Sequence, residues 1–239
     1  MNTKPYSFLL GEVLYLHDEK GEVGKERFTI TVDSEKNRTL RATCEIYQEK
    51  LLRDVTYSVD QNWVPLDAFV RLSVEGIFKG SSWFHFSKNQ VECESFTKDS
   101  GRSSQIVDLE RPIHSFGAHP VSNDAWGCAI YDMSDKQKKQ YFNNVITTSK
   151  TAHGNTGPSI MLTEKYLSFH GKENVSVPAG DFDSNYYQIS WGQEDMGREW
   201  PPIHIWTHGD DFMIVKIRWD HLKSDYVLNK LNLSSDKKI

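Results

Sequence analysis

The chain has 239 residues, of which 38% are hydrophobic and 26% are charged, and its formal net charge is -5. This composition is not that of a disordered chain, and the acidic balance argues against a nucleic-acid-binding protein, whose contact face is usually basic. No stretch approaches the ~20 apolar residues of a membrane span, and three widely spaced cysteines form no recognisable disulfide or zinc framework. The first residues lack the continuous apolar region of a secretory signal, so we expect a cytoplasmic protein with reduced thiols.

Alternation of apolar and polar residues dominates the first half of the sequence and predicts half-buried β-strands. In residues 52–60, for example, Arg53 and Tyr57 share one face with two valines, and Asp54 lies on the other face. The short spacing leaves no room for crossover helices, so we expect antiparallel hairpins. The predicted strands of this half are 8–16, 24–31, 38–47, 52–60, 66–74, 81–87, 90–97 and 102–109.

The alternation stops near Pro112, and residues 110–125 are irregular. Capping residues predict helical structure around 122–145, and residues 148–158 read as a loop. Strands then resume, with turns at 177–181 and 209–211. The strands predicted for this half are 159–169, 183–191, 202–208, 212–219 and 224–231.

These elements predict a mainly β fold, in which residues 1–239 form a single barrel-like domain. We expect one curved antiparallel sheet of about a dozen strands, a half-barrel or lipocalin-like barrel, because flat open sheets of that size rarely persist. The helical segment around 122–145 would be an insertion. The 7 Trp, 10 Tyr and 12 Phe are enough to furnish a cavity as well as a core.

The C-terminal stretches read VSVPAGDFDSNYYQISW, PPIHIWTHGDDFMIVKIRWD and SDYVLNKLN. Their valine-rich strand, Pro-Ala-Gly-x-Phe turn, tyrosine-bearing strand and W-x-x-G-D hairpin resemble a bacterial family of uncharacterised β-sheet proteins allied to the lipoprotein-carrier (Lol) half-barrels. The resemblance is specific over residues 175–231 and diffuse over 8–109. It implies a curved antiparallel sheet around an apolar cavity, with helices closing the mouth. It carries no catalytic motif over to this chain.

One candidate site lies on the predicted strand 202–208, where His204, Trp206 and His208 share a face. Two histidines four apart on a strand lie ~13 Å apart, which is too far for one metal ion, so we expect no metal site. Either His208 faces a ligand beside Trp206, or one histidine belongs to the sheet and the other to the hairpin.

A second candidate is the irregular stretch from residue 113 to 126, because connections of this kind often act as lids or binding loops. It carries His114, His119, Asp124 and Trp126. Histidine suits acid–base work near neutral pH, and Asp124 would orient His119. The alternative is that Asp124 caps a helix and both histidines are solvated.

A third candidate is a polar cavity containing Tyr57, Asp67 and Arg71, in which the guanidinium would bind an enolate or a carboxylate. Trp83 and His85 would line it if their shared face points inward. The alternative places these groups in ion pairs on the outer surface.

Three functions fit these patterns. The first is a cofactor-free lyase or isomerase acting on a hydrophobic terpenoid, steroid or aromatic compound, in which His119, oriented by Asp124, moves a proton and Tyr57 or His208 stabilises an oxyanion. The second is a non-catalytic binding protein for a lipophilic ligand. The third is an interaction module whose interior is filled by side chains. No nucleic acid is expected as a partner, and the oligomeric state stays open. The predicted substrate-binding residues are Arg71, Trp83, Trp126, Tyr187 and Trp206.

Overall fold

The structure is a computed structural model of the chain, and it describes residues 6–149, 151, 153–191 and 201–233. Over these residues, fifteen strands form one sheet in the order β8-β7-β6-β5-β4-β3-β2-β1-β15-β14-β13-β12-β11-β10-β9. The sheet is open, because the order runs from β8 at one edge to β9 at the other. The predicted single curved sheet is therefore confirmed, in its half-barrel form.

The first eight strands form a meander in which each strand pairs antiparallel with the next. All eight coincide, within a few residues at their ends, with the strands that the alternation predicts. They are β1 (Ser7–His17), β2 (Gly21–Val32), β3 (Arg38–Ile46), β4 (Leu51–Val59), β5 (Pro65–Val74), β6 (Ile77–Phe86), β7 (Gln90–Thr97) and β8 (Gly101–Asp108).

The second half adds seven strands, and the last of them pairs with β1 to join the two halves. The turns predicted at 177–181 and 209–211 are confirmed between β11 and β12 and between β13 and β14. The strands are β9 (Ser115–Gly117), β10 (Lys139–Thr147), β11 (Met161–Val177), β12 (Gly180–Trp191), β13 (Ile203–His208), β14 (Met213–Trp219) and β15 (Ser224–Leu233). Within the described ranges, β9 and β10 are the one pair of strands that is parallel.

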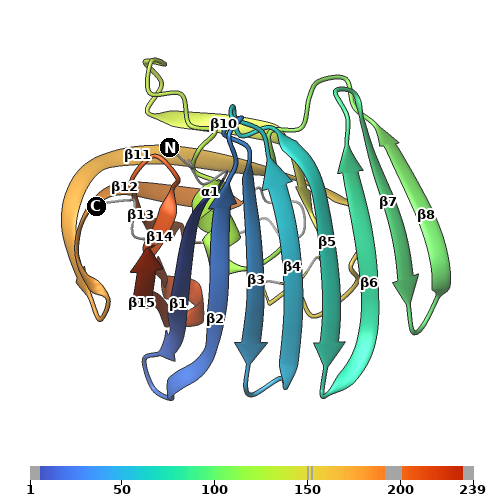
Figure 1. Ribbon diagram of the computed structural model, residues 1–239, viewed down its shortest axis with the longest axis horizontal. Helices are drawn as coiled ribbons and strands as arrows, with labels where there is room; N and C mark the ends of the chain where they lie inside the picture. The colour runs from blue at the N-terminus through green and yellow to red at the C-terminus, as the bar shows by residue number, and fades with distance from the viewer. Residues whose placement is uncertain (1–5, 150, 152, 192–200, 234–239) are drawn as a thin grey trace, which may run out of the picture.

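The sheet curls around an interior, with β1–β8 forming the front wall in Figure 1 and α1 lying behind them. Each strand turns one face inward. In β4, Arg53, Val55 and Tyr57 are buried on this inner face, whereas Leu52 points to the outer face and is exposed. Because β-strand side chains alternate, the same rule sorts most residues of the sheet into an inner and an outer set.

Residues 109–131, which we call the crossing segment, fill the inner face. They contain the short helix α1 (Val121–Trp126), and most of their apolar side chains are buried. The ring of Phe116 lies 5.0 Å from that of Phe84 and 5.1 Å from that of Phe86, both on β6. The crossing segment is thus part of the core and does not form a lid over a cavity.

The predicted helical insertion around 122–145 is reduced to the six residues of α1. Residues 139–147 form β10 instead, in which Gln140 and Phe142 are buried while Tyr141 is exposed. This alternation suits a half-buried strand, and Tyr, Phe and Asn are weak helix formers. In the described ranges, no helix is long and apolar enough to cross a membrane.

We expect Phe116→Ala to lower the free energy of unfolding by about 3–5 kcal/mol, because it empties a buried site between three aromatic rings. Phe96→Ala is the matched control, since Phe96 is 54% exposed and should change stability by less than about 1 kcal/mol. Urea-induced unfolding measures both. Equal losses for the two variants would contradict the assignment of the crossing segment to the core.

Candidate functional site

Glu26 on β2 is fully buried and ties the crossing segment to the sheet. Its Oε2 accepts hydrogen bonds from the Tyr15 hydroxyl and the Val121 N–H, both at 2.8 Å. Its Oε1 accepts from the N–H of Ser122 at 3.1 Å and from the Ser122 hydroxyl. The Cys44 thiol is a fifth donor, 3.6 Å from Oε2. Burial raises the pKa of Glu26, and the hydrogen bonds counteract that rise. So many protein donors indicate a structural anchor.

Arg53 on β4 holds the loop after β10 against the inner face. It is 2% exposed, and its Nη2 donates to the carbonyls of His153 (2.5 Å) and Gly154 (2.6 Å). Gly154 has a φ of +62°, and a Cβ there would lie 2.5 Å from Arg53 Nη2 and 2.6 Å from the His119 ring. Only glycine fits this position, so the guanidinium serves the fold.

Asp124, Cys128 and Lys165 form the interior group whose proton affinities are most suited to acid–base chemistry. Burial raises the pKa of Asp124 to about 7 and that of Cys128 to about 12, and it lowers the pKa of Lys165 to about 8. The Lys165 ammonium donates to the carbonyl of Gly127 at 2.9 Å. A carboxyl group and an amine that titrate near neutral pH are the kind of pair that catalysis uses.

Lys165, the amine of this group, is closed off from solvent, since it is 2% exposed. Cys128 is fully buried within the crossing segment, and Asp124 on α1 is partly buried. The hollows around Arg41 and around Phe96 both lie on the outer face. A substrate would reach the Lys165 ammonium only after the crossing segment had moved.

Two predicted catalytic residues lie in the interior with Asp124. Tyr57 is buried, its pKa is raised by burial, and its ring lies 5.8 Å from that of Trp126. His119 has a φ of +73°, and its Nε2 is hydrogen-bonded to the Thr147 hydroxyl at 3.2 Å. The charges that act on Asp124 come from Glu26, Lys165 and Arg53. The orientation of His119 by Asp124 stays a prediction.

His208, the fourth predicted catalytic residue, lies on the outer face of β13, where its Nδ1–H donates to the carbonyl of Asp183 at 2.8 Å. Tyr57 lies on the inner face, so the two side chains do not meet in one cavity. Trp206 shares the outer face with His208, stacks on Tyr186 at 4.8 Å and donates from Nε1 to Glu173.

The five predicted substrate-binding residues are also divided between the faces. Trp126 and Tyr187 are buried in the interior, whereas Arg71, Trp83 and Trp206 lie on the outer face. The predicted polar cavity containing Tyr57, Asp67 and Arg71 does not form. The reason is the register: Tyr57 is opposite Ala68, so Asp67 and Arg71 point to the other side of the sheet.

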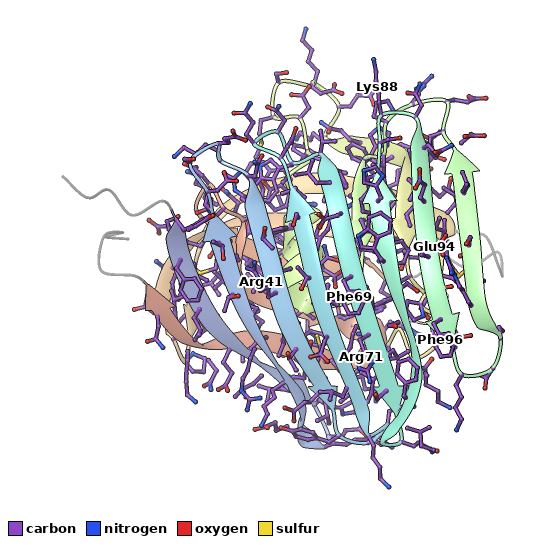
Figure 2. The ribbon with its side chains drawn as sticks, turned by 45° about the vertical axis from the view of Figure 1, so that its right-hand side comes forward. Arg41, Phe69, Arg71, Lys88, Glu94 and Phe96 are labelled. Atoms are coloured by element: carbon purple, nitrogen blue, oxygen red, sulfur yellow. The ribbon has the colours of Figure 1, made fainter. Side chains whose placement is uncertain are left out.

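The outer face of β5–β8 carries an exposed aromatic cluster, which we call the outer aromatic surface. The pairing register places its side chains in two rows across the strands. Ser81 is small, so its position between the larger side chains leaves a shallow hollow of about 300 Å³. Figure 2 shows Phe69, Arg71, Glu94 and Phe96 on this face. The rows are Phe69, Trp83, Glu94 and Ser104, and Arg71, Ser81, Phe96 and Arg102.

Contacts with aromatic rings hold the side chains of this surface in place but leave them exposed to solvent. Arg71 lies over the ring of Phe78 at 4.5 Å, and Phe78 stacks on Phe96 at 6.4 Å. Phe69, Trp83 and Phe96 are nevertheless 43%, 42% and 54% exposed. Exposed apolar groups gathered on one face commonly mark an interaction site.

Sequence reasoning missed Glu26, Lys165, Phe69 and Phe96 as notable residues. Glu26 alternates with Phe28 and Ile30 on β2, so the strand pattern contained the signal of an inward carboxylate. The partners of Lys165 come from the crossing segment, and no local pattern indicates them. Among the described residues, no three His, Cys, Asp or Glu side chains converge as a metal site.

Comparison with known proteins reveals a likeness of fold. No protein-family model matches the sequence, and no curated protein matches it. The chain is similar to a β-barrel-like protein of the domain of unknown function DUF1849 from Brucella abortus, at 11% identity and a TM-score of 0.58, over 97% of this chain and 98% of that chain. At this identity, the similarity shows the fold alone.

Two further structures are similar at lower TM-scores. One is a DUF1089 family protein from Pseudomonas aeruginosa, at 7% identity and a TM-score of 0.45, over 79% of this chain and 86% of that chain. The other has a YmcC-like fold and comes from Bacteroides fragilis, at 9% identity and a TM-score of 0.30, over 97% of both chains.

We expect Asp124→Asn to change how stability depends on pH. In the wild type, the pKa of Asp124 is about 7 in the folded state against 3.8 as the reference, so the contribution of Asp124 to stability is greatest below pH 4 and falls as the pH rises to 7. The variant lacks this loss, and from pH 4 to 8 it should gain about 2–4 kcal/mol relative to the wild type. Urea unfolding across this range measures the difference. Parallel pH profiles would show that Asp124 ionises normally in the folded protein.

Proposed function

We propose that this protein is a non-catalytic interaction module that binds a polypeptide partner through the outer aromatic surface. One observation carries the proposal: the inner face is filled by the crossing segment, while three exposed aromatic side chains, Phe69, Trp83 and Phe96, gather on the outer face of β5–β8. A filled interior is what distinguishes an interaction module from a carrier or an enzyme with a barrel cavity.

The composition of the surface supports a protein partner. Trp83 and Phe96 flank the hollow, and the guanidinium of Arg102 borders it. Tryptophan and arginine are enriched among the residues that dominate binding energy in protein interfaces. Arg102 has only a weak ion pair with Glu94, at 3.3 Å, and its side chain is 80% exposed, so it is available to a partner.

The shape of the hollow supports a protein rather than a small molecule. Sites for small ligands are usually concave and enclose most of the ligand surface. The hollow over Ser81 is shallow and bordered by side chains of adjacent strands, so it would hold one large apolar side chain of a partner whose backbone lies across the strands. The polar and charged side chains in the two rows of β5–β8 form a polar rim around this hollow.

A carrier for a lipophilic ligand is the second candidate function. The resemblance of residues 175–231 to the lipoprotein-carrier half-barrels favours it, and the curved sheet is compatible with it. In this case the crossing segment would have to leave the inner face to admit the ligand, which would break its three hydrogen bonds to Glu26.

A cofactor-free lyase or isomerase is the third candidate function. The pKa of Asp124 near 7 and that of Lys165 near 8 favour acid–base chemistry. It too requires the crossing segment to open, and it would use Lys165 in place of the outward-facing His208.

We expect selection of random linear peptides on the wild-type protein to enrich sequences with a large apolar side chain. Phe96→Ser and Trp83→Ser should weaken the selected peptides about tenfold or more, because they remove the side chains around the hollow. Leu162→Ser is the matched control: Leu162 is 50% exposed on β11, outside the outer aromatic surface, and its loss should leave affinity within about twofold.

Other outcomes would redirect the assignment. Peptides that bind Phe96→Ser as tightly as the wild type would contradict the proposal. A lipid or other lipophilic compound that stays bound in native mass spectrometry, and is kept by Phe96→Ser, would favour the carrier. Turnover of such a compound that is lost in Asp124→Asn would favour the enzyme.

A further inference from the structure

The two edges of the sheet differ in how they are protected. At one end β9 has three residues, and short edge strands do not recruit other chains. At the other end β8 has eight residues, contains neither proline nor lysine, and pairs with β7 without a bulge. In the described part of the chain, no strand pairs with the outer side of β8, which lies at the right-hand end of the sheet in Figure 1.

The hydrogen-bond pattern identifies the backbone groups at this open edge. The N–H of Leu109 donates to the carbonyl of Asn89 at 2.7 Å, so these two residues form a hydrogen-bonded pair. Hydrogen-bonded and non-hydrogen-bonded pairs alternate along an antiparallel ladder. Residues 101, 103, 105 and 107 therefore direct their N–H and C=O groups toward β7. The groups that point outward belong to Arg102, Ser104, Ile106 and Asp108.

We propose that two copies of this chain pair through β8, antiparallel and with Gln105 on the two-fold axis, so that their sheets become continuous. This inference goes beyond the proposed function, because it depends on the backbone of the edge strand β8 and on the charges of Arg102 and Asp108, and not on the exposed aromatic side chains.

Two independent features select this register. With Gln105 on the axis, all four residues whose backbone groups point outward pair with such residues of the second copy. With Ser104 or Ile106 on the axis, only three of the four residues do so. The same register places Arg102 opposite Asp108 of the second copy, and by symmetry this pair occurs twice. Opposite charges directly across from each other stabilise antiparallel pairs, and like charges destabilise them.

The side chains of β8 suit this interface. Arg102, Ser104, Ile106 and Asp108 are all exposed on the outer face. Ile106 is 64% exposed, and in the pairing it would lie beside Ser104 of the second copy. Because the two-fold axis is perpendicular to the sheet, both outer aromatic surfaces would face the same side and lie next to each other.

The test is the mass of the purified full-length protein, measured by sedimentation velocity over a concentration series. We expect a species of twice 27.6 kDa. Arg102→Asp alone and Asp108→Arg alone place like charges opposite each other, so each should raise the dimer dissociation constant about tenfold or more. The double variant Arg102→Asp with Asp108→Arg restores opposite charges and should return the constant to within about threefold of the wild type.

A backbone variant tests the edge directly. Ser104→Pro removes an outward N–H and should abolish the dimer, whereas Ser104→Ala keeps the N–H and should retain it. Thermal unfolding checks that each variant is folded. If Ser104→Pro does not fold, the Arg102 and Asp108 variants alone decide whether the dimer forms through β8. A wild-type protein that stays monomeric at about 100 µM, or a dimer that none of these variants weakens, overturns the proposal. Loss of peptide binding in Phe96→Ser with an unchanged dimer would show that the two surfaces act separately.

Discussion

A sheet of fifteen strands that curls on itself creates an apolar inner surface that must be covered, and here the chain covers it with its own residues 109–131. The Glu26 carboxylate holds this cover in place by accepting hydrogen bonds from the backbone of Val121 and Ser122 and from the Ser122 hydroxyl. Tyr15 and Cys44, on the two strands that flank β2, donate to the same carboxylate. A buried carboxyl group that lost these donors would carry a desolvation penalty with no compensation. The position of the crossing segment against the sheet follows from this anchor.

Filling the interior has opposite effects on the two faces of the sheet. On the inner face, removal from water shifts the pKa values of Asp124 and Lys165 toward neutrality and closes Lys165 off from a substrate. On the outer face, the side chains that cannot fit inside remain exposed, and Phe69, Trp83 and Phe96 gather where β5–β8 leave one small residue between them. Burial thus produces the groups with shifted pKa values, whereas the side chains that stay exposed are the ones that a partner can reach. An accessible surface is the better basis for assigning a function.

Most of the fold could be predicted from alternation, because a half-buried strand must place apolar residues at every second position. β9 could not be predicted in this way, because three residues are too few to show a period and its parallel partner β10 lies far along the chain. The sequence predicts helix over β10 because Asn and Lys obscure an alternation that becomes evident only with Gln140 and Phe142 buried. The direction in which each candidate site residue points could be predicted less well. Tyr57 and Trp126 do meet in the interior, whereas His208 and Arg71 point away from it.

Local sequence patterns are enough to show which residues share a face of each strand, where the hairpins turn, and that the strands form one curved antiparallel sheet. They do not show which face is the inner one, because both faces of these strands carry aromatic and charged residues. That Arg53 points inward and Arg71 outward is evident only in the folded chain. The physical reason is that the choice depends on the crossing segment, whose contacts with Glu26 span about ninety-five positions of sequence and leave no trace in any local pattern.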